Sequence, residues 1–135
     1  MISEKRTVGL VEKVKVTGKK TVETYAVFDT GAKVSSIDVQ MAGKIGVGEA
    51  VRYMKVKNPS TKFPAKRPVV KVVLEILGQK FDADVNIQDR SHMSFPVIVG
   101  RNVMSGNFVV DCQRNEELFL NKGTRKDAKN IKDYV

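Results

Sequence analysis

An apolar, β-prone stretch of this chain ends in an acidic residue that turn-forming residues follow at once. The stretch is Ala26-Val27-Phe28, the acidic residue is Asp29, and Thr30-Gly31-Ala32 come next. Valine and phenylalanine favour strands, whereas Asp, Thr and Gly are common in tight turns. The sequence therefore predicts a carboxylate at the end of a strand, with hydrophobic packing behind it. An ordinary surface β-turn is the simplest alternative for these residues.

Short β-prone segments separated by turn residues recur along the chain, and they predict a closed or sandwiched all-β domain with one or two short helices. We place this domain at residues 1–121 and expect a basic, flexible tail at residues 122–135. One helix is expected at residues 39–44, ended by Gly46. Strands are expected at residues 8–16 (with a break at 11–13), 21–29, 34–38, 51–57, 69–77, 80–87, 96–99, 108–111 and 118–120.

Composition bounds the class of protein. The chain has 135 residues, a formal net charge of +9 and one cysteine, Cys112. One cysteine excludes an internal disulfide and fits a reducing compartment, and no apolar run is long enough for a transmembrane helix. We therefore expect a cytoplasmic protein that does not contact a membrane. The basic residues are spread along the chain without interleaved aromatics, which favours an ordinary basic surface over nucleic-acid binding; a polyanionic substrate or partner is the alternative.

A second motif lies downstream, where the apolar residues 97–99 run into Gly100-Arg101-Asn102 and a helix is expected to begin at residues 103–105. Together with Asp29-Thr30-Gly31-Ala32 and the exit Ser35-Ser36-Ile37, it resembles the retropepsin-type aspartic peptidases. The resemblance covers roughly residues 6–112 and implies a closed retropepsin-like barrel. In that family the Gly-Arg segment passes behind the catalytic loop, where its glycine permits close packing and its arginine braces the fold or the dimer.

The resemblance also implies a reaction and an oligomeric state. Aspartic peptidases need two carboxylates that share a proton, and this chain holds one Asp-Thr-Gly. We therefore expect a symmetric homodimer that pairs two Asp29 residues as general acid and general base on a peptide bond. Thr30 would hydrogen-bond across the dimer axis, and Gly31 and Ala32 would allow two backbones to approach. Ser35 or Ser36 would steady the loop.

The stretch Arg90-Ser91-His92-Met93-Ser94-Phe95-Pro96 narrows the resemblance. It is similar to small bacterial and archaeal retropepsin-like domains described as ATP-dependent zinc proteases, which are associated with ATP-grasp ligases that add glutamate to a ribosomal protein. The residues do not support the zinc label, because His92 and Cys112 lack metal-spaced partners. They do not support an ATP site either, because no P-loop is present. We expect no cofactor and assign His92 a local hydrogen bond that organises its loop.

A flap over the substrate is expected at residues 49–68, with Tyr53, Lys55 and Phe63 as candidate contacts. This segment has no glycine after Gly48 and is rich in lysine, so it would be a stiff, basic lid suited to an acidic peptide. A long surface loop without a lid function is the alternative. The sequence favours an aspartic endopeptidase. Its rivals are a non-catalytic adaptor of the same fold that binds a peptide or a ligase, and a basic barrel that binds RNA or the ribosome.

Overall fold

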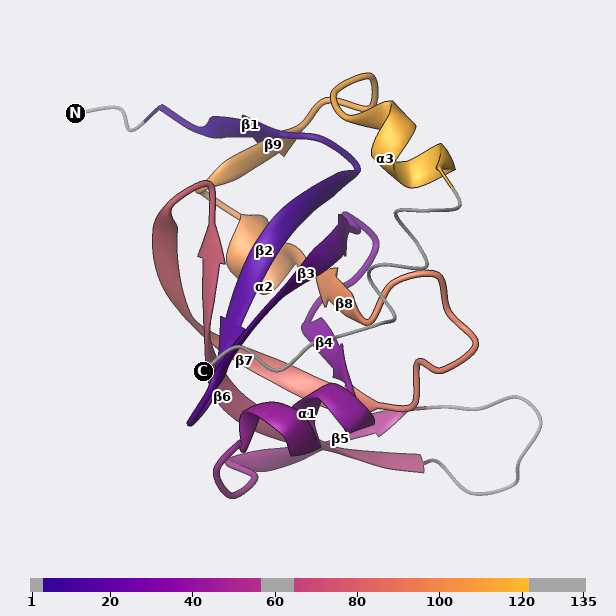
Figure 1. Ribbon diagram of the computed structural model, residues 1–135. Helices are drawn as coiled ribbons and strands as arrows, with labels where there is room; N and C mark the ends of the chain where they lie inside the picture. The colour runs from indigo at the N-terminus through magenta and orange to yellow at the C-terminus, as the bar shows by residue number, and fades with distance from the viewer. Residues whose placement is uncertain (1–3, 57–64, 122–135) are drawn as a thin grey trace.

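The computed structural model describes residues 4–56 and 65–121 of the chain. Six strands form a closed barrel in the order β2–β3–β8–β4–β7–β6, and β6 pairs back onto β2 to complete the ring (Figure 1). The predicted all-β barrel is confirmed. The elements are β1 (Arg6–Val8), β2 (Val11–Thr17), β3 (Thr21–Phe28), β4 (Ser35–Asp38), α1 (Val39–Ile45), β5 (Arg52–Val56), β6 (Ala65–Ile76), β7 (Gln79–Gln88), β8 (Val97–Val99), α2 (Arg101–Met104), β9 (Phe108–Val110) and α3 (Glu116–Leu120).

The core fills the barrel because alternate residues of each strand point inward. In β3 the residues at positions 22, 24, 26 and 28 are buried and those between them are half-buried. Ile37, Leu74 and Val99 are fully buried in the same cluster. Helix α1 closes one end, with Asp38 as its N-cap and Gly46 as its C-cap at φ 68°. The helix predicted to end at Gly46 is therefore confirmed.

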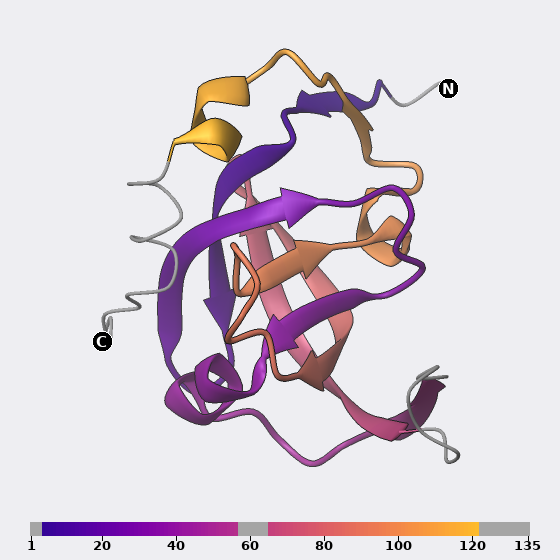
Figure 2. The same ribbon diagram turned by 90° about the vertical axis from the view of Figure 1, so that its right-hand side faces the viewer.

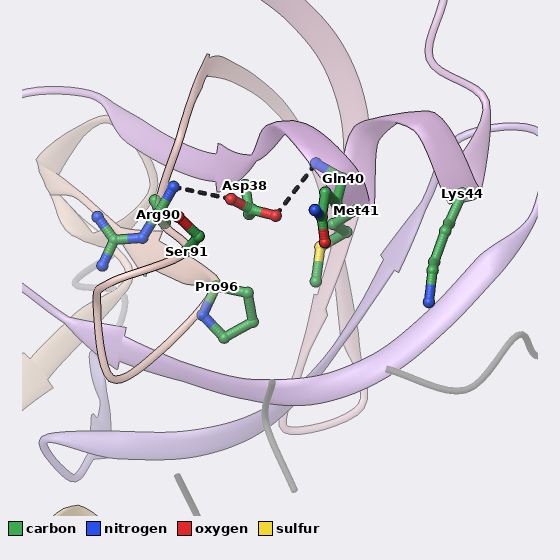
Figure 3. A pocket seen from close by; sticks show the side chains of 7 residues that line it. All are labelled: Asp38, Gln40, Met41, Lys44, Arg90, Ser91 and Pro96. Atoms are coloured by element: carbon green, nitrogen blue, oxygen red, sulfur yellow. Dashed lines mark hydrogen bonds between the residues drawn. The ribbon is translucent and has the colours of Figure 1, made fainter. Parts of the chain in front are cut away.

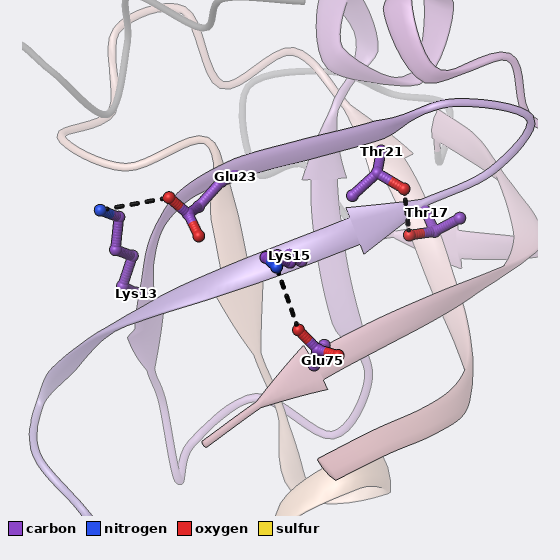
Figure 4. A network of polar contacts seen from close by, with 6 residues as sticks. All are labelled: Lys13, Lys15, Thr17, Thr21, Glu23 and Glu75. Carbon is purple, nitrogen blue, oxygen red and sulfur yellow. Dashed lines mark hydrogen bonds and ion pairs between the residues drawn. The ribbon is translucent and has the colours of Figure 1, made fainter. Parts of the chain in front are cut away.

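The outward face of β2, β3 and β6 carries paired charges. Lys13 contacts Glu23 at 3.2 Å and Lys15 contacts Glu75 at 3.6 Å (Figure 4). Exposed pairs of this kind contribute about 0–1 kcal/mol each. They neutralise part of the basic surface locally, and this face is an ordinary solvent-exposed side of the sheet.

Three features differ from the sequence-based expectation. Residues 118–120 were predicted as a strand but lie in α3, the third short helix among the described residues, where Phe119 stacks on Phe95 at a ring-centroid distance of 6.3 Å. A short apolar run does not distinguish a strand from a helix, so tertiary packing determines the secondary structure of residues 118–120. Helix α2 begins at Arg101, directly after Gly100, and not at residues 103–105.

The third difference is the interruption between β1 and β2. It lies at Gly9 and Leu10, not at residues 11–13. A Cβ at Gly9 would clash with the Arg114 carbonyl oxygen. This close approach lets the chain after β9 cross the start of β2. Strand β1 pairs in parallel with β9 as a separate two-stranded ribbon, which lies against the barrel near the end of β3 (Figure 2).

Strand β5 pairs only with β6, and together the two strands extend from the barrel as an antiparallel ladder (Figure 1). The expected strand at 51–57 is therefore confirmed over Arg52–Val56. Residues 57–64 lie outside the described residues, as does the predicted tail at 122–135. None of the helices described here is long and apolar enough to cross a membrane.

Candidate active site

Asp29 lies directly beyond the end of β3. Its N–H donates to the Val99 carbonyl at 3.0 Å, which continues the β3–β8 ladder by one residue. The Asp29 side chain is exposed, and its Oδ1 accepts the Gly31 N–H at 2.8 Å. The Asp29 carbonyl accepts the Ala32 N–H at 3.1 Å and closes the turn. The carboxylate is therefore held by its own loop and faces solvent in a single copy of the chain.

The segment Gly100–Asn102 supports this turn from behind (Figure 2). The Arg101 N–H donates to the Ala32 carbonyl at 2.8 Å, and the Asn102 N–H donates to the Lys33 carbonyl at 3.2 Å. The Arg101 guanidinium reaches the Thr30 carbonyl at 3.2 Å. A Cβ at Gly100 would lie 2.8 Å from the Val34 carbonyl carbon. Glycine is therefore needed for the close contact, and the structure brings the two sequence motifs together.

Ser35 ties the two motifs with its side chain. Ser35 is fully buried; its Oγ donates to Asn102 Oδ1 at 2.8 Å and accepts the Gly100 N–H at 2.9 Å. The Ser35 N–H also donates to Asn102 Oδ1, at 2.9 Å. Asn102 Nδ2 donates to the Asp84 carbonyl at 2.8 Å, which extends the network to β7. Buried groups satisfied in this way rigidify the loop that carries Asp29.

Ser36 points to the opposite face of β4 and links the loop to the β5–β6 hairpin. Its Oγ donates to Asn86 Oδ1 at 2.8 Å, and Asn86 Nδ2 donates to the Met54 sulfur at 3.7 Å. Both Ser36 and Asn86 are buried. Sequence reasoning did not identify Asn86 or Met54. The available signal was an asparagine between two apolar residues, Val85 and Ile87, where a buried amide needs partners.

Ser36 and Asn86 lie on one side of the sheet, which we call the Asp29 face. In the strand registers Ile98 lies opposite Ser36, Ser36 opposite Asn86, and Asn86 opposite Val69, so their side chains share one side of the sheet. Residues two positions apart on a strand share a side, so Arg67 on β6 lies on the same side as Val69. Val27 lies opposite Ile98, so Asp29, two positions after Val27, also follows on this side. The face is the side of β3, β8, β4 and β7 that points away from the core.

The loop between β7 and β8 holds His92. Its imidazole is exposed, with Nδ1 3.4 Å from the Ser91 hydroxyl oxygen. Hydrogen bonds from Ser91 hold the pKa of Asp89 below its ordinary value. No group of three potential metal ligands occurs in the described part of the chain. The candidate flap residues Tyr53 and Lys55 lie exposed on β5, and Phe63 falls outside the described residues.

A model of the RimB-like family, described as the retropepsin-like aspartic endopeptidase RimB, matches residues 44–118, which is more than half of the chain. The chain belongs to this family. The match includes the β5–β6 arms and Gly100–Asn102, and it begins after the Asp29 loop. The resemblance to retropepsin-like peptidases is confirmed, while the association with glutamate ligases stays a prediction. No curated protein sequence matches the chain.

Solved structures share the fold of this RimB-like protein. One is a Legionella pneumophila protein of unknown function, 21% identical, with a TM-score of 0.52 over 81% of this chain and 94% of that one. Another is the EIAV protease in complex with the inhibitor HBY-793, 14% identical, with a TM-score of 0.51 over 75% of this chain and 91% of that one. At such identities the likeness concerns the fold alone, and it agrees with the predicted retropepsin-like barrel.

Proposed function

We propose that this RimB-like protein is a homodimeric aspartic endopeptidase that uses one Asp29 from each subunit. The observation that carries the proposal is Asp29 itself, an exposed carboxylate at the end of a strand, in a turn braced by Gly100–Asn102. The family and the fold are those of aspartic peptidases. The chain contains one Asp-Thr-Gly, so a second carboxylate must come from a second copy about a two-fold axis.

In the proposed reaction the two carboxylates share one proton and bind a water molecule. The ionised Asp29 takes a proton from the water as its oxygen attacks the peptide carbonyl carbon, and the protonated Asp29 gives its proton to the carbonyl oxygen. Collapse of the resulting diol breaks the C–N bond, and a proton passes to the leaving nitrogen. Gly31 and Ala32 present little bulk where the second copy would approach, and Thr30 would meet its symmetry mate.

The proposed substrates are acidic peptides. Residues 51–74 contain no Asp or Glu, and the β5–β6 ladder places Lys55 directly opposite Lys66, a like-charge pair that an anion would relieve. A glutamate-extended protein tail would fit this charge. An ATP-grasp glutamate ligase as partner follows from the subfamily resemblance, and a cytoplasmic location is proposed from the single cysteine. The basic residues of this segment are Arg52, Lys55, Lys57, Lys62, Lys66, Arg67 and Lys71.

The experiment compares wild type with Asp29→Asn on pools of acidic and mixed peptides, at acid and neutral pH, with dimer content measured by light scattering. We expect the wild type to cleave. Asp29→Asn should lose cleavage while keeping its fold and dimer, because the amide cannot act as the general base. Equal cleavage by both proteins would contradict the proposal.

A non-catalytic adaptor of the same fold is the second candidate, because the family match begins after the catalytic loop and covers the scaffold alone. It predicts peptide or ligase binding by a dimer that never cleaves. A basic RNA- or ribosome-binding barrel is the third reading and has only the net charge of +9 behind it. Salt-dependent RNA binding that survives Asp29→Asn, without peptide cleavage, would favour that reading.

A further inference from the structure

Arg90 is a buried cation on the Asp29 face. It follows β7, and its backbone N–H donates to Asp38 Oδ1 at 2.7 Å. Its side chain passes beneath its own loop, where Nε donates to the Phe95 carbonyl at 2.9 Å. Only 6% of the residue is exposed. A charge buried to this extent is normally paired, so the partner of Arg90 needs to be identified.

No carboxylate among the described residues forms an ion pair with Arg90. Asp38 is the nearest candidate, but its two oxygens accept the N–H groups of Arg90 and Gln40. The two terminal guanidinium nitrogens have no hydrogen-bond partner in the described part of the chain, and they keep contact with solvent because no fully covered side-chain nitrogen there lacks a partner. The planar end of Arg90 therefore keeps a small contact with solvent, and its paired N–H donors suit a carboxylate.

The pKa of Arg90 indicates which charges act on its guanidinium. Burial lowers this pKa most, and the positive charge of Arg67 lowers it further. The negative charges of Asp38 and Asp29 act in the opposite direction. Asp29 and Arg67 therefore both act on the guanidinium electrostatically, and its hydrogen bond to the Phe95 carbonyl places it close to the start of β8. Arg90 also lines a cavity of about 140 Å³ beside α1, together with Gln40 and Lys44, but its guanidinium points away from those two side chains (Figure 3).

We propose that Arg90, assisted by Arg67, is the specificity-determining residue that binds a carboxylate side chain of the substrate beside Asp29. This inference rests on the proposed peptidase function and names the residue that reads substrate charge. Arg67 is half-buried on the same face as Asn86 and repels Arg90, so an anion between them would relieve the repulsion and supply the missing partner. Lys55 and Lys66 lie on the opposite side of the hairpin and would contribute only at long range.

The test uses pairs of peptides that differ in one Glu→Gln change at each position around the cleaved bond. We expect wild type to prefer a Glu peptide by about tenfold or more in kcat/KM at one position, as a charge-assisted hydrogen bond allows. Arg90→Met should bring this Glu/Gln ratio close to one, and Arg90→Lys should restore part of it. Arg67→Gln should lower the ratio even if Arg90→Met fails to fold. Lys80→Gln, an exposed cation at the opposite end of β7 from Asn86, is the control and should leave both the ratio and the activity unchanged.

In the Asp29→Asn protein the affinities for the Glu and Gln peptides are compared instead of kcat/KM. This comparison separates the inference from the peptidase proposal. Charge-selective binding that depends on Arg90, in a protein that never cleaves, would support the inference and overturn the peptidase. A Glu/Gln ratio unchanged in both Arg90→Lys and Arg67→Gln would overturn the inference. Loss of binding to a single-stranded RNA in these variants, with Glu and Gln peptides bound equally by wild type, would also overturn it.

Discussion

Asn102 Oδ1 accepts both the backbone N–H and the hydroxyl of Ser35, at 2.9 and 2.8 Å. One amide thereby joins two motifs that lie 67 positions apart in the chain. Because Ser35 is fully buried and follows the Asp29 turn, this contact fixes where the turn sits relative to the barrel. The Asp29 carboxylate is thus positioned by a residue that would not itself touch a substrate.

Removal of this amide should destabilise the fold. Asn102→Ala leaves the buried Ser35 without its acceptor, which costs about 1–3 kcal/mol, and it removes the donor to the exposed Asp84 carbonyl, which water can replace. Urea unfolding should show the loss as a lower midpoint. Asn102→Asp is the matched variant, because it keeps the acceptor for Ser35 and loses only the donor to Asp84. Equal stability of Asn102→Ala and wild type would show that the network does not hold the loop.

Gly100 should tolerate no side chain. A Cβ there would lie 2.8 Å from the Val34 carbonyl carbon and 2.9 Å from the Ala32 carbonyl oxygen, and backbone atoms cannot move aside cheaply. Gly100→Ala is expected to cost about 1–3 kcal/mol and to lower peptidase activity by displacing the Asp29 turn. Gly43→Ala is the control. Nothing lies within 4 Å of its added Cβ, and in helix α1 alanine should stabilise by about 0.5–1 kcal/mol. Thermal unfolding of the two variants should therefore shift in opposite directions.

The loop before β8 should respond to acid through Asp89. Hydrogen bonds from Ser91 favour the charged carboxylate and depress the pKa of Asp89 in the folded state. The stabilisation is therefore present above the unfolded pKa and is lost as the pH falls through the lower folded pKa. Carboxyl chemical shifts should give a folded midpoint below that of the unfolded chain. Ser91→Ala should raise the folded midpoint. A midpoint that does not move in Ser91→Ala would contradict the assignment.

Local sequence signals were sufficient for the barrel and for the two loop motifs. Alternation located β3 and the β6–β7 hairpin, and Gly46 marked the end of α1, because these features depend on neighbouring residues. The chain could not reveal that Asn86 links Ser36 to Met54, because that network depends on the register of strands distant in sequence. Residues 118–120 were assigned to the wrong element for the same reason, since Phe95 determines how Phe119 packs.

Arg90 shows the same limit at the candidate site. In the sequence it was part of a family-like stretch around His92, and His92 drew attention as the only histidine. In the structure His92 is exposed, whereas Arg90 is buried on the face that carries Asp29. Burial of a long cationic side chain results from how its loop folds over Asp38 and Phe95, and no periodicity in the sequence encodes it.

Subunit mixing tests most directly whether one site needs two Asp29 residues. Wild type and Asp29→Asn are unfolded together, refolded at constant total concentration and assayed at several ratios. If each site needs both carboxylates, mixed dimers are inactive and activity follows the square of the wild-type fraction. An equimolar mixture should then retain about a quarter of the wild-type activity, as random pairing in a two-fold dimer requires. Retention of about half of the activity, as independent subunits give, or of about three quarters, as a shared site that needs one Asp29 gives, would contradict the account.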